Sequence, residues 1–207
     1  MRPREIVGRR GVTLIGMASV AVLLTMTVGL RVVHGQAQHV SWDIISLVPG
    51  TPNTFNPGGV AFASARNPST LKIRLTGSGT FVAPASGGPS SAVTGGGTWQ
   101  TFSGTTLTGS GAYWVTRLAS WEFGSFQTGT AIDNTGDVNA RANGSAVVLI
   151  QYSDASNGTL GIGCHGPGAP NGIVEGVIAT KDHVTYWDAE APGAPSVDKN
   201  RTLFHRN

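Results

Sequence analysis

The chain of 207 residues contains a single cysteine, Cys164. One cysteine cannot form a disulfide within a monomer, so side-chain packing has to supply the stability of the fold. We expect the thiol either to be buried as a small apolar group or to be available for intermolecular pairing or chemistry.

Charged residues are also scarce, at 12% of the chain, and they are unevenly placed. Five of the fourteen basic residues and one of the eleven acidic residues precede residue 38, which leaves nine basic and ten acidic residues beyond it. The isoelectric point of about 9.4 therefore reflects the leader. Because no basic stripe remains to contact a phosphate backbone, we expect no nucleic-acid partner.

The first 37 residues have the three parts of a secretory signal. Residues 1–10 carry four arginines, residues 11–30 form an apolar run without a charge, and residues 35–37 offer small side chains for cleavage. The pair Arg9-Arg10 is similar to a twin-arginine signal but lacks the usual Ser or Thr before it. The alternative is an uncleaved membrane anchor over residues 12–33. Both hypotheses place the rest of the chain outside the cytoplasm of a bacterium, secreted, periplasmic or on the cell surface.

No segment after the leader shows sustained helical periodicity. Eight to ten segments rich in β-branched and aromatic residues are separated by short turns that contain Gly, Pro or Asn. We predict that residues 38–207 form one all-β domain, either a single antiparallel β-barrel of about eight strands or a barrel-like sandwich. Within residues 107–123 the alternation breaks around Arg117, which predicts a β-bulge there.

One phrase occurs three times. Residues 76–81 read Thr-Gly-Ser-Gly-Thr-Phe, residues 94–99 read Thr-Gly-Gly-Gly-Thr-Trp, and residues 108–113 read Thr-Gly-Ser-Gly-Ala-Tyr. In an extended strand the two glycines and the aromatic residue of each copy fall on one face. A bare face lets a neighbouring ring lie over the backbone and permits sharp coiling, so the phrase favours a closed, strongly curved sheet.

The polar residues give little support for catalysis. Cys164 and His165 are adjacent, so on a strand they point to opposite faces and cannot act as nucleophile and base for one another. The histidines and carboxylates show no metal-ligand spacing such as C-x-x-C. We therefore predict no catalytic residue, no metal and no cofactor.

Three acidic residues stand inside strand-like segments, namely Asp43, Glu122 and Glu175. An ionised carboxylate there needs a partner if it is buried. Arg74, Arg117 and Arg201 could supply one, and structural ion pairs are the default interpretation.

The aromatic residues are the best candidates for a binding role. Tyr113 and Trp114 lie on opposite parities, so one of them has to face solvent, a partner or a second layer. Core packing is the more common fate of such rings, and stacking on a sugar or an apolar ligand is the alternative. The residues we predict to bind a ligand are Phe81, Trp99, Tyr113, Trp114, Glu175 and His183.

Four segments together resemble a group of exported bacterial all-β proteins that is uncharacterised: VTGGGTWQTF (93–102), SGAYWV (110–115), IQYSD (150–154) and VDKNRTLFH (197–205). The resemblance covers nearly all of the chain after the leader and implies no activity, cofactor or catalytic residue. The repeated phrase alone is similar to strands of the allene oxide cyclase and dirigent-type barrels, which would imply an isomerase or cyclase.

These observations leave three hypotheses. The first is a non-catalytic barrel that binds a small apolar molecule, a glycan or a protein at one end or face. The second is a barrel isomerase or cyclase, and the third is a surface protein that self-associates through an open sheet edge, so an oligomer remains open. A cavity between Phe81, Trp99 and Tyr113 would favour ligand binding or catalysis, and a filled interior would remove the support for both. A solid core with an exposed tryptophan would favour recognition of a partner or glycan.

Overall fold

The structure is a computed structural model that describes residues 36–190 and 200–207. The chain divides into two units, residues 1–35 and residues 36–207, and only the second is described here. The predicted signal segment therefore lies outside the described residues, apart from residues 36 and 37. In the part that is described, no helix is both long enough and apolar enough to cross a bilayer.

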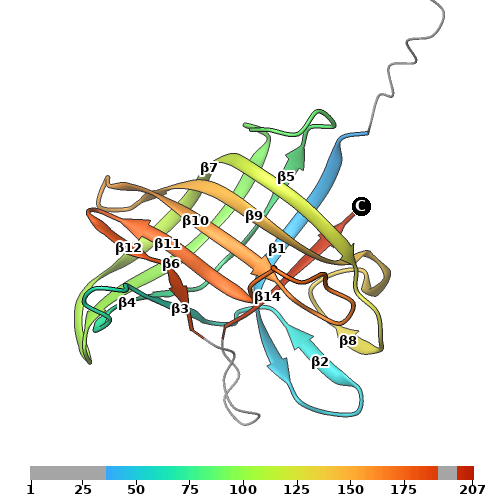
Figure 1. Cartoon of the computed structure of the whole chain (residues 1–207), viewed down its shortest axis with the longest axis horizontal. Helices are drawn as coiled ribbons and strands as arrows, with labels where there is room; N and C mark the ends of the chain where they lie inside the picture. The colour runs from blue at the N-terminus through green and yellow to red at the C-terminus, as the bar shows by residue number, and fades with distance from the viewer. Residues whose placement is uncertain (1–35, 191–199) are drawn as a thin grey trace, which may run out of the picture. The chain divides into compact units, whose positions relative to one another are not determined.

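The described residues form an all-β domain, as predicted (Figure 1). Its strands in chain order are β1 (Gln38–Val48), β2 (Asn53–Asn56), β3 (Ala61–Ser64), β4 (Leu71–Leu75), β5 (Ser78–Ala83), β6 (Val93–Ser103), β7 (Thr106–Phe126), β8 (Ala131–Asp133), β9 (Arg141–Tyr152), β10 (Asn157–Cys164), β11 (Gly176–Lys181), β12 (Val184–Tyr186), β13 (Asp188–Ala189) and β14 (Arg201–Arg206). One turn of 3-10 helix, η1 (Val138–Ala140), precedes β9.

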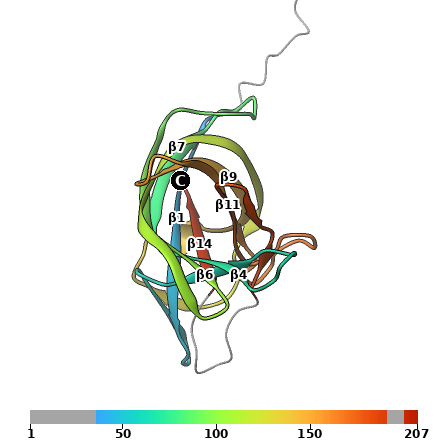
Figure 2. The same cartoon turned by 90° about the vertical axis from the view of Figure 1, so that its left-hand side faces the viewer.

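Six antiparallel strands close the barrel in the order β9, β14, β1, β5, β6, β7 and back to β9. Figure 2 shows these strands curving around a common interior. The ring has fewer than the expected eight or so strands because short strands share the edges of long ones. β5 and β4 pair in turn along one edge of β6, and β14 and β10 pair along one edge of β9. The strands β3, β4, β10, β11, β12 and β13 then continue the sheet beyond the ring.

The glycines of the repeated phrase allow neighbouring strands to approach closely and aromatic rings to pack directly on the backbone. Gly109 and Gly111 lie under Trp99, where an added Cβ would stand 3.1 Å and 3.0 Å from the indole. Gly97 differs from the expected pattern, because an added Cβ there would overlap the carbonyl oxygen of Thr76. The phrase therefore serves both ring seating and direct contact between backbones.

The interior between the three predicted ligand-binding rings is filled. Phe81, Trp99 and Tyr113 are 1%, 4% and 2% exposed and belong to the single hydrophobic core. The rings of Trp99 and Tyr113 both contact Tyr152, with centroid distances of 5.6 Å and 6.4 Å. These three residues are core residues, which is the more common fate of such rings.

The parity and bulge predictions for the longest strand are confirmed. Tyr113 points into the core, and its hydroxyl donates to the carbonyl of Thr76, whereas Trp114 is 44% exposed. The register between β7 and β9 shifts between Val115 and Arg117, where the bulge was expected. Two further shifts follow, so β7 bends repeatedly along β9.

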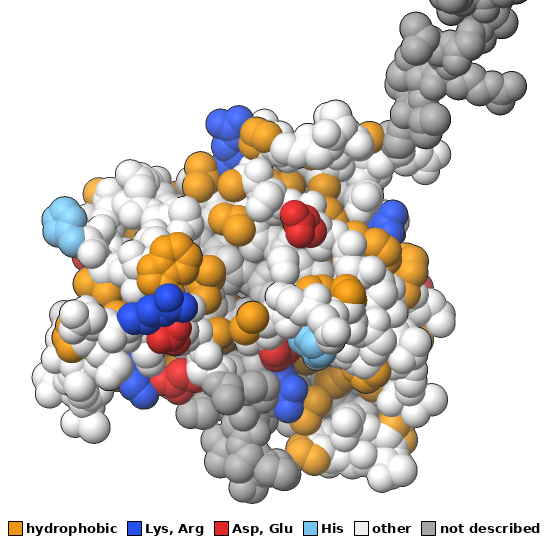
Figure 3. Space-filling model, in the orientation of Figure 1, with side chains coloured by type: hydrophobic (Ala, Val, Ile, Leu, Met, Phe, Trp, Pro, Cys, Tyr) orange, Lys and Arg blue, Asp and Glu red, His pale blue; other side chains and the backbone are white. Residues whose placement is uncertain are grey.

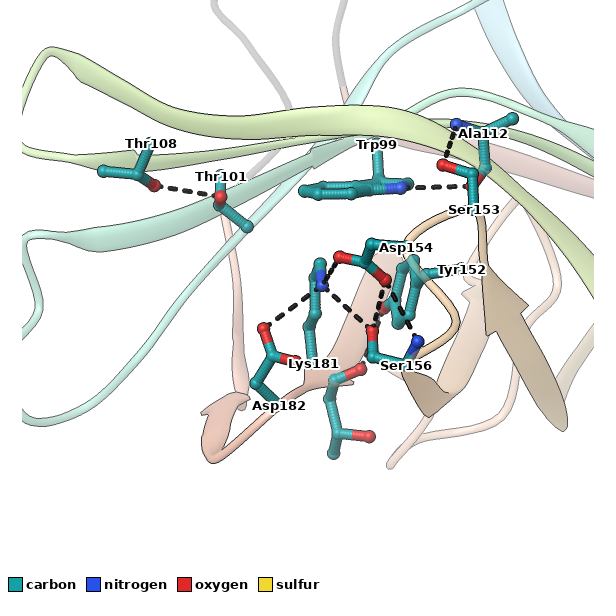
Figure 4. A network of polar contacts seen from close by, with 11 residues as sticks. Trp99, Thr101, Thr108, Ala112, Tyr152, Ser153, Asp154, Ser156, Lys181 and Asp182 are labelled. Carbon is teal, nitrogen blue, oxygen red and sulfur yellow. Dashed lines mark hydrogen bonds and ion pairs between the residues drawn. The ribbon is translucent and has the colours of Figure 1, made fainter.

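The ammonium group of Lys181 lies at the edge of the core, near the turn between β9 and β10 (Figure 4). Lys181 is 4% exposed, and its Nζ lies 4.3 Å and 4.8 Å from the ring centroids of Trp99 and Tyr152. The same nitrogen pairs with the carboxylates of Asp154 and Asp182. The two carboxylates therefore compensate the positive charge of Lys181, while its side chain packs on the two rings at this edge of the core.

Candidate functional site

A hollow lies at the end of the barrel where β10 ends and β11 begins. It has a volume of about 550 Å³. One wall comes from the end of β1 and the small sheet that β2 forms with β1 and β8. The opposite wall consists of residues 127–130, which follow β7, and residues 165–169, which follow β10. We call this hollow the end pocket.

The sequence explains why the chain leaves the barrel here. β1 continues past its pairing with β14 and then pairs with β2 over Ser46, Leu47 and Val48. The segment 165–169 contains two glycines and a proline, and Gly168 has a positive φ of 85° that favours glycine. These turns cannot extend the strands, so they form the rim of the pocket.

Glu175 is the one predicted ligand-binding residue that lines the end pocket. Its Oε2 accepts a hydrogen bond from the backbone N–H of His165 at 2.5 Å, and its Oε1 accepts one from the N–H of Thr202 at 2.8 Å. Burial raises the pKa of Glu175, although these N–H donors and the more distant Arg201 guanidinium act in the opposite direction. The carboxylate thus ties β14 and the loop after β10 to the start of β11.

Cys164 also lines the pocket. It is buried, which is one of the two alternatives that the sequence left open. Its sulfur accepts a hydrogen bond from Gln127 Nε2 at 3.2 Å. Burial, assisted by the nearby Glu175 carboxylate, raises the pKa of the thiol well above its usual value. A thiol of this kind is a poor nucleophile near neutral pH, because the thiolate is the reactive form.

Two arginines complete the charged lining. Arg141, at the start of β9, is 4% exposed and donates to the carbonyls of Val138 and Gly129. Its guanidinium carbon lies 5.6 Å from the centroid of the Phe55 ring. Arg201, at the start of β14, is partly exposed. Within the described residues, neither guanidinium has a carboxylate at ion-pair distance.

The structure separates the other predicted ligand-binding residues from this pocket. Phe81, Trp99 and Tyr113 are in the core, and Trp114 is on the outer face of β7. His183 is exposed in the turn after β11, whereas Glu175 immediately precedes β11, so the two stand at opposite ends of that strand. The six residues therefore do not form one site.

The outer face of β9, β10 and β11 carries a shallower groove of about 260 Å³. Its floor includes Gly161 and Gly163, and Val174 and Trp187 lie exposed at its edge. Trp187 is 56% exposed. Figure 3 shows hydrophobic side chains on the corresponding side of the molecule, interspersed with a few charged ones. Exposed apolar side chains beside a groove are typical of a contact surface.

Asp133 and His205 form a buried pair on the outside of the barrel. His205 Nε2 lies 2.9 Å from Asp133 Oδ2, and an added Cβ at Gly136 would stand 2.8 Å from the imidazole. The pair fastens the segment between β8 and η1 onto β14. Since that segment follows a wall of the end pocket, the pair supports the pocket without lining it.

The sequence did not identify the arginines and apolar residues of the end pocket as ligand-binding residues. Arg201 was considered only as an ion-pair partner, and Arg141 and Phe55 were not singled out. Their positions depend on the pairing of β2 with β8, which is parallel and joins residues 78 positions apart, such as Asn53 and Ala131. One usable signal was present, because Arg141 is a charged residue only five positions before the apolar run 146–150.

Among the residues described, no three His, Cys, Asp or Glu side chains are grouped as metal ligands would be. Comparison of the chain with known protein families, with curated proteins and with solved structures finds no match.

Proposed function

We propose that this domain is a non-catalytic binding protein that takes up a small amphipathic molecule in the end pocket. The observation that carries the proposal is the pocket itself. Its volume of about 550 Å³ falls in the range of roughly 300–1,000 Å³ typical of small-molecule sites. Apolar side chains from β1, β2 and β14 share the lining with about as many polar or charged side chains, a mixture that suits an amphipathic ligand.

The chemistry of the lining favours binding over catalysis. Both carboxylate oxygens of Glu175 accept backbone hydrogen bonds, so the group is held in place as a structural acceptor. The Cys164 thiol is protonated because burial raises its pKa. The burial of Phe81, Trp99 and Tyr113 leaves both a ligand site and an isomerase site between these rings without support, so the proposal rests on the end pocket instead.

A second candidate is recognition of a protein or glycan on the outer face, because Trp187 stands exposed beside the outer groove. Self-association through a sheet edge has less support. The strands at the ends of the sheet order, β12 and β13, are three and two residues long in the described chain. Such short edges offer few unpaired groups.

The proposal can be tested with phenylnaphthylamine, a neutral apolar fluorophore, and one blocking variant. Thr128 is exposed and lines the end pocket, so Thr128→Trp should fill the pocket without disturbing the core. We expect this variant to lose at least tenfold in affinity. The matched control is Thr105→Trp, in the exposed turn between β6 and β7, which should bind like the parent chain. Equal binding by both variants would contradict the proposal.

A further inference from the structure

We propose that the ligand of the end pocket is an organic monoanion, whose acidic group binds between Arg141 and Arg201 while its apolar body lies against β1 and β2. This inference rests on the proposed function, since it specifies the ligand of the same pocket. It follows from the charge balance of the lining, the state of each arginine and the distribution of apolar side chains.

The charges that line the pocket do not cancel. Its ionisable residues are Arg141, Cys164, His165, Glu175 and Arg201. Among these residues, the two arginines and Glu175, counted as ionised, give a net charge of +1. A ligand with a single negative charge would neutralise the site, whereas a dianion would overcompensate it.

Of the two arginines, Arg141 gives the stronger support for an anionic ligand. Arg141 as a whole residue is only 4% exposed, and a charge in so buried a residue usually has a carboxylate partner, because burying an unpaired charge is costly. Here its partners are two neutral carbonyls and the face of Phe55. Nε and Nη2 are used by those carbonyls, and Nη1 has no hydrogen-bond partner among the described residues. The counterion that this charge lacks can come from a ligand in the pocket.

Arg201 provides a second donor from another strand. No hydrogen bond or ion pair engages its side chain within the described residues, and it begins β14, which pairs with β1 at Ile45. Glu175 acts on Arg201 only at a distance, since it forms no ion pair with it, and its oxygens accept backbone hydrogen bonds from His165 and Thr202. A guanidinium carries a positive charge and several N–H donors, so it can bind an acidic group through charge-assisted hydrogen bonds.

The apolar part of the ligand has a surface of its own. Ile45 and Leu47 of β1, Phe55 of β2, Ala131 of β8 and Leu203 of β14 line the pocket. Phe55 both stacks on Arg141 and contributes to this apolar surface. The acidic end and the apolar end of the ligand would therefore meet adjacent parts of the lining.

Two fluorophores with a shared aromatic body test the inference. Anilinonaphthalene sulfonate carries one negative charge, and phenylnaphthylamine carries none. We expect Arg201→Gln and Arg141→Gln each to weaken binding of the sulfonate about tenfold, the size of one lost charge-assisted hydrogen bond, and to change binding of the neutral probe less than twofold. Arg141→Lys and Arg201→Lys should restore most of the loss.

Controls separate this inference from the function on which it rests. Arg117→Gln changes an exposed arginine on β7 outside the pocket and should affect neither probe. Equal losses for both probes in the arginine variants, with unchanged melting temperatures, would overturn the role of the charges but leave the pocket as the binding site. Undiminished binding of both probes to Thr128→Trp would overturn the proposed function itself.

Discussion

Asp43 is a partly buried carboxyl group on β1 with an unfavourable environment for its charge. Burial raises its pKa to about 6, assisted by the Asp133 carboxylate and opposed by His205. In contrast, the pKa of Asp133 is lowered, because hydrogen bonds from Thr135 and His205 outweigh its burial. The two carboxyl groups therefore respond differently to pH, although both act on the same imidazole.

The raised pKa predicts the pH dependence of stability. The native state holds the Asp43 proton more tightly than the unfolded state, so this contribution is fully present below pH 3.8 and is lost as the pH rises to about 6. Asp43→Asn should then raise the free energy of unfolding by about 1–2 kcal/mol at pH 7.5, allowing for partial exposure, and have little effect at pH 3.5. Thermal melts of Asp43→Asn and the parent chain between pH 3.5 and pH 7.5 measure this difference in stability. A constant difference between variant and parent would contradict the prediction.

Lys181 and its acidic partners should differ sharply in their effects on stability. The lysine is buried and stacked between two rings, whereas 43% of the Asp154 side chain is exposed. We expect Lys181→Ala to cost about 2–3 kcal/mol of unfolding free energy, because both packing and a cation–π contact are lost, and Asp154→Asn to cost less than about 1 kcal/mol. Chemical denaturation of the two variants measures this, and equal costs would refute it.

The stabilisation from the Lys181–Asp154 ion pair should also depend on pH. Hydrogen bonds from Lys181 and Ser156 lower the pKa of Asp154 to about 2. The contribution of the carboxylate is therefore present above its unfolded value of 3.8 and is lost as the pH falls to about 2. The difference in stability between the parent chain and Asp154→Asn should shrink over that interval, as urea titrations can show.

At the scale of the strands, the glycine phrases carry the clearest mutational prediction. Gly97 abuts the backbone of Thr76, whereas its neighbour Thr98 is exposed and shares a hydrogen bond of 2.7 Å with the Thr76 hydroxyl. Gly97→Val should cost about 3 kcal/mol or more, because β4 and β6 would have to separate. Thr98→Val should cost about 1 kcal/mol or less. Equal melting temperatures for the two variants would contradict this account.

Strand alternation predicted much of the fold, because side-chain parity depends only on local sequence. Residues 73, 75 and 81 share one parity in the sequence, and Ile73, Leu75 and Phe81 are all buried. It also separated Tyr113 from Trp114. It could not show that β4 and β5 share an edge of β6, since pairing between distant strands leaves no mark within any one of them.

At the scale of the whole molecule, the described residues combine a packed core with a pocket at one end, and the proposed function rests on this division. The rings expected to surround a ligand instead fill the interior. The residues that line the pocket come from eight strands or their flanking loops, so no single motif could have identified them. Glu175 was singled out as an acidic residue inside a strand-like segment, although it lies just before β11 in the structure. Arg141 and Phe55 become meaningful only when β2 and β8 are paired.

The most direct test is to map the binding site by nuclear magnetic resonance. Amide chemical shifts of the ¹⁵N-labelled protein would be followed while anilinonaphthalene sulfonate is added. The account predicts the largest shifts in residues 45–55, 127–131, 165–169 and 201–203, with little change near Trp114 and Trp187. Shifts centred on Trp187 and the outer groove, with the end pocket unaffected, would contradict it.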